Sequence, residues 1–141
     1  MATKPAEPDA PGIDLDQVCT TGDTAVWLRQ QAARHTAEAT TESSPAGARA
    51  LRLAGSTLEV YATVVGTYRD PAGIGAELAR HAADYRHPDR DAVEPIPDDY
   101  RLSCGHLAGV LDTLAQQLTR AAGPKQHQRH PVESCDRHIG L

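Results

Sequence analysis

Phenylalanine is absent from this chain of 141 residues, and aromatic residues make up only 4% of it. Cysteine is also scarce, with three residues at widely separated positions. An odd number of scattered cysteines does not build the disulfide framework that stabilises small secreted domains. The first twelve residues contain no apolar stretch of the kind that follows the positive charge of a secretion signal. We therefore expect a protein of the reducing cytoplasm.

Positive charge is in short supply as well, because 14 Lys and Arg residues stand against 19 Asp and Glu, which gives a net charge of -5. Such a chain lacks the electrostatic attraction that brings proteins to phosphate groups. We expect neither nucleic acid nor an anionic membrane surface as a partner. No stretch approaches the roughly 20 apolar residues that a membrane span requires, so the sequence predicts no insertion into a bilayer.

Four segments have the apolar spacing of amphipathic helices. Serine or aspartate before a proline marks the start of the second and third, because the first side chain can cap a helix and proline fits its first turn. A Gly-Pro pair ends the fourth. The predicted helices cover residues 23–40, 45–68 and 71–87, and a fourth follows Asp98 or Asp99 as its cap and ends before Gly123. Residues 87–98 contain three prolines and four acids and are predicted to form the longest internal loop.

Four helices with two short turns and one long loop are typical of an antiparallel bundle. The predicted fold class is all-α, an antiparallel up-down four-helix bundle with flexible N- and C-terminal arms. We expect a flexible arm over 1–21, the bundle domain over 22–123 and a His-rich tail over 124–141. The last few residues of the first arm are candidates for docking on the bundle.

An alanine-rich bundle without phenylalanine buries little apolar surface per residue, which favours a second apolar surface shared between subunits. Val60 and Val64, or Trp27 and Val110, are candidates for that surface. The alternative is a monomer that holds these residues in its own core. Our first hypothesis is a small accessory or regulatory protein that is non-catalytic, homodimeric and acts through protein–protein contacts.

The second hypothesis is a bundle that binds a metal or a small molecule through residues of several helices, either as a binding protein or as an enzyme. His35, His81 and His106 come from three predicted helices and fall near the same end of an alternating bundle. Three inward-facing histidines could bind a divalent metal with one open position. The alternative is that they are hydrogen-bonded residues at the border of the core.

The tail offers a separate metal hypothesis. It contains His127-x-x-His130 and Cys135-x-x-His138, and imidazole and thiolate are ligands that Zn²⁺ prefers. Only one cysteine is present and a proline interrupts the segment, so an incidental cluster of solvated histidines is the alternative. We expect no obligatory cofactor, with Zn²⁺ or another divalent metal as the candidate if one binds.

Tyr-Arg pairs flank the proline-rich loop and give the candidate ligand site. Tyrosine hydroxyls and guanidinium groups could line a pocket for an anionic or aromatic small molecule; its candidate residues are Tyr85, Arg86, His87, Tyr100 and Arg101. Tyrosines at the rim of a bundle, with arginines near helix ends, are the alternative reading. Catalytic motifs such as G-x-S-x-G, H-E-x-x-H and the Gly-rich phosphate loop are missing, so an enzyme is the less favoured interpretation.

Overall fold

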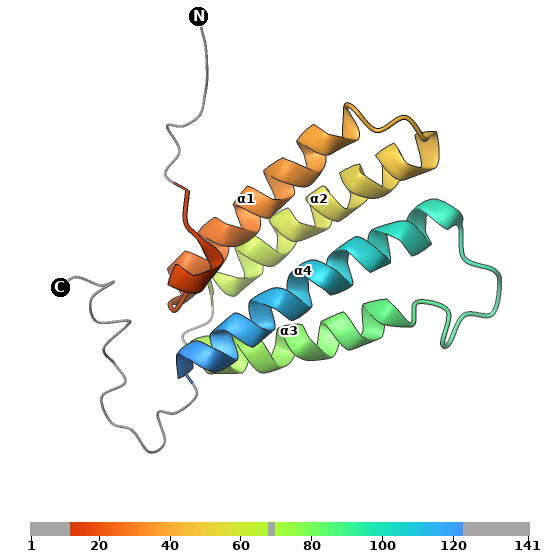
Figure 1. Cartoon of the computed structure of the whole chain (residues 1–141). Coiled ribbons are helices and arrows are strands. Elements are labelled where there is room, and N and C mark those ends of the chain that lie inside the picture. The colour runs from red at the N-terminus through yellow and green to blue at the C-terminus, as the bar shows by residue number, and fades with distance from the viewer. Residues whose placement is uncertain (1–11, 68–69, 123–141) are drawn as a thin grey trace, which may run out of the picture.

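Four α-helices make up most of the protein, as a computed structural model that describes residues 12–67 and 70–122 shows (Figure 1). They are α1 (Thr21–Ala39), α2 (Pro45–Val65), α3 (Pro71–Arg86) and α4 (Asp98–Ala122), and a short 3-10 turn, η1 (Leu15–Gln17), precedes them. The described residues contain no strand. The all-α prediction is confirmed, and the packing of the helices is consistent with a bundle.

The helix starts follow the local capping chemistry. Ser44 accepts a hydrogen bond from the backbone N–H of Gly47 at 3.0 Å, and Pro45 opens α2 as predicted. Helix α1 begins two residues earlier than predicted, because Thr20 and Asp23 form a reciprocal capping box. This box satisfies two backbone N–H groups that would otherwise lack a partner. Helix α1 therefore starts at Thr21 and not at Asp23.

Leucine and alanine fill the core between the helices. Leu28, Leu58 and Leu111 are completely buried, and alanines such as Ala54 and Ala62 lie beside them without any exposed surface. Small side chains allow neighbouring helix axes to come close. The core is therefore continuous across all four helices although it contains no phenylalanine.

Glycine permits two close helix contacts. A Cβ atom on Gly55 of α2 would lie 2.7 Å from Oγ1 of Thr36 and 3.0 Å from the carbonyl oxygen of Ala32, both on α1. A Cβ atom on Gly75 of α3 would lie 3.2 Å from Cβ of Leu118 on α4. The molecule thus consists of two tightly packed helix pairs, α1–α2 and α3–α4, which meet where α2 contacts α4 (Figure 1).

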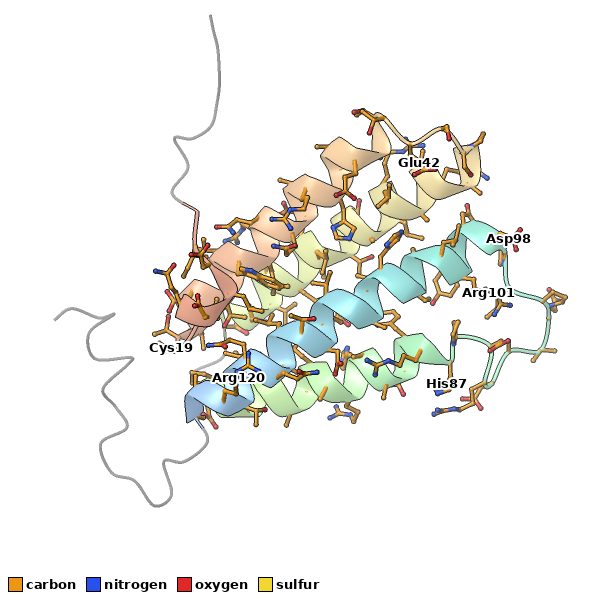
Figure 2. All side chains as sticks on the ribbon, in the orientation of Figure 1. Cys19, Glu42, His87, Asp98, Arg101 and Arg120 are labelled. Carbon is orange, nitrogen blue, oxygen red and sulfur yellow. The ribbon has the colours of Figure 1, made fainter. Side chains whose placement is uncertain are left out.

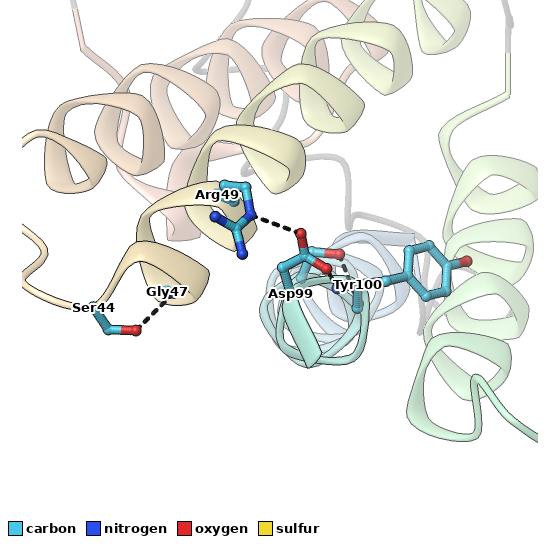
Figure 3. A network of polar contacts seen from close by, with 6 residues as sticks. Ser44, Gly47, Arg49, Asp99 and Tyr100 are labelled. Atoms are coloured by element: carbon cyan, nitrogen blue, oxygen red, sulfur yellow. Dashed lines mark hydrogen bonds and ion pairs between the residues drawn. The ribbon is translucent and has the colours of Figure 1, made fainter. Parts of the chain in front are cut away.

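An ion pair connects these two helix pairs at one end. Arg49, near the start of α2, donates to the carboxylate of Asp99, at the start of α4, over 3.0 Å (Figure 3). The hydrogen bond from Arg49 lowers the pKa of Asp99. The starts of α2 and α4 therefore lie at the same end of the molecule.

The described end of the predicted N-terminal arm packs on the bundle. Val18 is fully buried, and Ile13 and Leu15 contact the core. The Gln30 amide of α1 accepts from the N–H of Ile13 at 2.6 Å and donates to its carbonyl at 3.0 Å. The Gln117 amide of α4 donates to the carbonyl of Val18 at 3.0 Å. Residues 13–18 are thus docked, whereas residues 1–11 and the tail from 123 onward lie outside the described residues.

Membrane insertion finds no support in the helices. None of the helices that the structure describes combines the length and the apolar character needed to cross a bilayer.

Candidate functional site

The predicted Tyr-Arg residues gather at one end of the molecule, around the loop that joins α3 to α4. His87 and Arg101 lie there, at the end opposite Cys19 and Arg120 (Figure 2). Tyr85 ends the core-facing side of α3 and Tyr100 lies in the first turn of α4. Together with the loop they enclose an open pocket of about 440 Å³, which is lined by Asp84, Tyr85, His87, Pro88, Arg90, Asp91, Ala92, Tyr100 and Cys104. We call it the loop pocket.

The two remaining residues of the predicted site, Arg86 and Arg101, line a neighbouring groove of about 500 Å³. The groove shares Tyr85 and Pro88 with the loop pocket, so the two hollows adjoin. The structure therefore brings the five predicted residues to one place but divides them between two adjacent hollows.

Both of these arginines are already paired. Arg86 lies 2.8 Å from the carboxylate of Asp112 on α4, and Arg101 lies 3.3 Å from that of Asp89 in the loop. All four side chains are partly exposed, so each pair adds little to stability. Their main effect is to neutralise the guanidinium groups that the sequence analysis assigned to an anionic ligand.

Four lining residues that carry polar or ionisable groups were not expected from the sequence. Asp84, Arg90 and Asp91 are exposed residues on and after the end of α3. Cys104 is almost fully buried and follows Tyr100 by four positions on α4. That spacing places both side chains on one helix face and could have connected them, whereas no sequence pattern indicates how the loop folds back.

Cys104 and Tyr100 supply neutral groups to the loop pocket. Burial raises the pKa of the Cys104 thiol, and a hydrogen bond with that thiol raises the pKa of the Tyr100 hydroxyl. Both groups are therefore protonated at neutral pH. The protonated thiol is a poor nucleophile.

A hydrogen-bond network with Tyr61 and His81 fixes the side chain of Tyr85. The hydroxyl of Tyr61 on α2 donates to that of Tyr85 at 3.3 Å and lies 2.6 Å from Nδ1 of His81. The Tyr61 and His81 rings meet edge to face at 5.5 Å, and Nε2 of His81 lies 3.6 Å from Glu77. Burial raises the pKa of Tyr61. Tyr85 is thus a wall of the loop pocket that is fixed by contacts between α2 and α3.

The histidine triplet proposed from the sequence does not form a group. His35 and His106 meet edge to face, with ring centroids 5.5 Å apart, whereas His81 contacts Tyr61 instead. Nδ1 of His35 bonds the carbonyl of Gln31 at 2.8 Å. Burial and the neighbouring His35 lower the pKa of His106, and the carboxylates of Glu38 and Glu42 partly oppose this.

Metal binding gains no support from the residues that the structure describes. Over 12–67 and 70–122, no group of three or more His, Cys, Asp or Glu side chains could hold a metal ion. The candidate ligands of the tail, His127, His130, Cys135 and His138, lie outside the described residues. The metal hypothesis for the tail therefore stays a prediction.

An exposed apolar stripe follows one side of α2. Leu53, Val60 and Val64 are 40%, 61% and 44% exposed. A small recess of about 60 Å³ lies between α2 and α3, and it is lined by Tyr61, Val64, Val65, Ile74, Glu77, Leu78 and His81. Val60 and Val64 therefore fit the predicted apolar surface.

The other predicted pair does not fit such a surface. Trp27 is buried, at 7% exposure, and Val110 packs against the core of its own chain.

Comparison of the whole sequence and structure with protein-family models, curated proteins and solved structures finds no match.

Proposed function

We propose that this protein is a small non-catalytic accessory or regulatory protein that acts through protein–protein contacts as a homodimer, without a metal cofactor. The observation that carries the proposal is the exposed stripe of Leu53, Val60 and Val64 on α2. Large apolar side chains that lie together on a surface are characteristic of interaction sites. A second copy of the chain is the occupant that the geometry favours.

The spacing of the stripe is symmetric. With Thr57, which lies on the same side of the helix, the positions 53, 57, 60 and 64 are separated by four, three and four residues. If two α2 helices pair about a two-fold axis in opposite directions, Leu53 meets Val64 of the second copy and Thr57 meets its Val60. A self-complementary patch of this kind is what a two-fold dimer requires.

The stripe also suits burial chemically. Neither the three stripe residues nor Thr57 carries a charge, so pairing these side chains buries no charge. The recess beside Val64 gives room for the longer side chain of Leu53 from the second copy. We therefore place the dimer contact on α2.

The finer architecture belongs to the same proposal, namely an antiparallel up-down bundle with flexible arms before and after it. Short connections over residues 40–44 and 66–70 favour opposite directions for consecutive helices. Gly75 lies early in α3 and closely approaches Leu118, which lies late in α4; this contact supports opposite directions for α3 and α4 as well.

The test is the mass of the particle in solution, measured by size exclusion with light scattering and by sedimentation. We expect the wild-type chain to be a dimer and Val60→Asp to be a monomer with unchanged helix content. Loss of two buried valines, at about 1.5 kcal/mol or more each, raises the dimer dissociation constant by about 100-fold or more.

Thr63→Asp is the matched control, because Thr63 is exposed on the same helix but lies off the stripe. This variant should remain a dimer although it adds the same charge. A wild-type monomer at every concentration, or dissociation caused equally by both substitutions, would remove α2 as the dimer contact.

A further inference from the structure

The loop pocket lies in the most acidic part of the described chain. Residues 84–101 carry six Asp and Glu side chains against three arginines. Two of those arginines, Arg86 and Arg101, are ion-paired outside the loop pocket. Arg90 is the one guanidinium in its lining, which also contains the carboxylates of Asp84 and Asp91. The excess charge of the lining is negative.

The ends of the two helices add to this charge distribution. The carboxyl end of α3, with its negative dipole, lies at the loop pocket between Asp84 and His87. The amino end of α4 also borders it, but Asp98 and Asp99 in the first turn offset its positive dipole. A cation is therefore favoured over an anion here.

Neutral aromatic walls accompany the carboxylates. The Tyr85 hydroxyl accepts a hydrogen bond from Tyr61, and the Tyr100 hydroxyl is hydrogen-bonded to the Cys104 thiol. Tyrosine rings attract organic cations through their electron-rich faces and also contact apolar groups. A volume of about 440 Å³ suits an organic molecule rather than a bare ion.

We propose that the loop pocket binds a small organic amine, whose ammonium group pairs with Asp84 and Asp91 and whose apolar part lies against Tyr85 and Tyr100. This assignment reverses the sign of the ligand charge expected from the sequence. It is independent of the dimer, because no residue of the α2 stripe lines the loop pocket.

The test uses three probes with the same ring and different charge: 2-phenylethylamine, 2-phenylethanol and 3-phenylpropionate. Each is titrated into the ¹⁵N-labelled full chain and followed by amide chemical shifts. We expect the amine to shift residues 84–92 and 100–104, with a dissociation constant in the millimolar range that is typical of such small ligands. The alcohol should bind at least about fivefold more weakly, because it loses the exposed ion pairs with Asp84 and Asp91.

Variants locate the binding groups. Removal of both carboxylates by Asp84→Asn with Asp91→Asn should weaken the amine by about fivefold or more. Tyr100→Leu should weaken it by about two- to fivefold, because a cation–π contact is lost. Glu94→Gln is the matched control, since Glu94 is exposed in the same loop but outside the lining; it should leave binding unchanged.

Three results would overturn the assignment. The carboxylate probe could bind as tightly as the amine, the shifts could fall outside the loop pocket, or Glu94→Gln could weaken binding as much as the double substitution. Because all the replaced side chains are partly or fully exposed, the variants should keep the helix content of the wild type. Circular dichroism of each variant checks this directly.

Discussion

Gly55 and Gly105 allow the helix packing to be tested with one chemical change at two positions. Both glycines lie inside long helices, Gly55 in α2 and Gly105 in α4. Replacement by alanine removes the same backbone freedom from the unfolded chain in both cases. The surroundings differ: a Cβ atom at Gly105 meets nothing within 4 Å, whereas one at Gly55 meets Thr36 and Ala32.

The expected magnitudes follow from these distances. Gly105→Ala should raise the free energy of unfolding by about 1 kcal/mol, the usual difference in helix propensity. Gly55→Ala gains the same amount but brings Cβ within 3.0 Å of a main-chain carbonyl that cannot rotate away. Overpacking of this kind costs about 1–3 kcal/mol. The net effect is a loss of up to about 2 kcal/mol.

Urea and thermal unfolding measure the difference, with circular dichroism for the helices and fluorescence of Trp27 for the core. Protein concentration must be held fixed, since the proposed dimer would make Tm depend on it. We expect Gly105→Ala to melt about 3–5 °C above the wild type and Gly55→Ala to melt at or below it. Equal stabilisation by both substitutions would refute the close approach of α1 and α2.

Two further predictions concern the docked segment and the histidine pair. Gln117→Ala should cost about 1–3 kcal/mol, because it leaves the buried carbonyl of Val18 without its donor; unfolding measures the loss, and a change near zero contradicts the docking. The lowered pKa of His106 means that the folded state favours the neutral ring. The contribution of His106 to the free energy of unfolding is therefore fully present above about pH 6.5, the usual His value. This contribution is lost as the pH drops through the lower folded pKa. His106→Gln should flatten this profile in urea unfolding, and parallel profiles would contradict a lowered pKa of His106 in the folded state.

The helices were predictable because their signals are local. Ser44-Pro45 and the proline after Asp70 mark helix starts through capping and φ preference, which depend on adjacent residues alone. The docking of residues 13–18 was open in the sequence. It depends on Gln117, which lies about a hundred positions away along the chain, and no periodicity connects the two.

The candidate site was predictable in position but not in charge. Tyr85 and Tyr100 flank the proline-rich loop, and helices that enter and leave one loop must place these residues near each other. Arg101 pairs with the carboxylate of Asp89 in that same loop, and this pairing depends on how the loop folds rather than on residue spacing. For the same reason residue spacing did not indicate that His81 contacts Tyr61 instead of the other histidines.

The division into an α1–α2 pair and an α3–α4 pair bears on how the chain folds. Each pair joins helices that are consecutive in sequence, so its contacts close only short loops and cost little chain entropy. The contacts between α2 and α4 span a longer stretch of chain and close last in this scheme. Proteins whose contacts are mostly local in this way fold rapidly, and we expect the contacts at the Arg49–Asp99 end to be among those that form late.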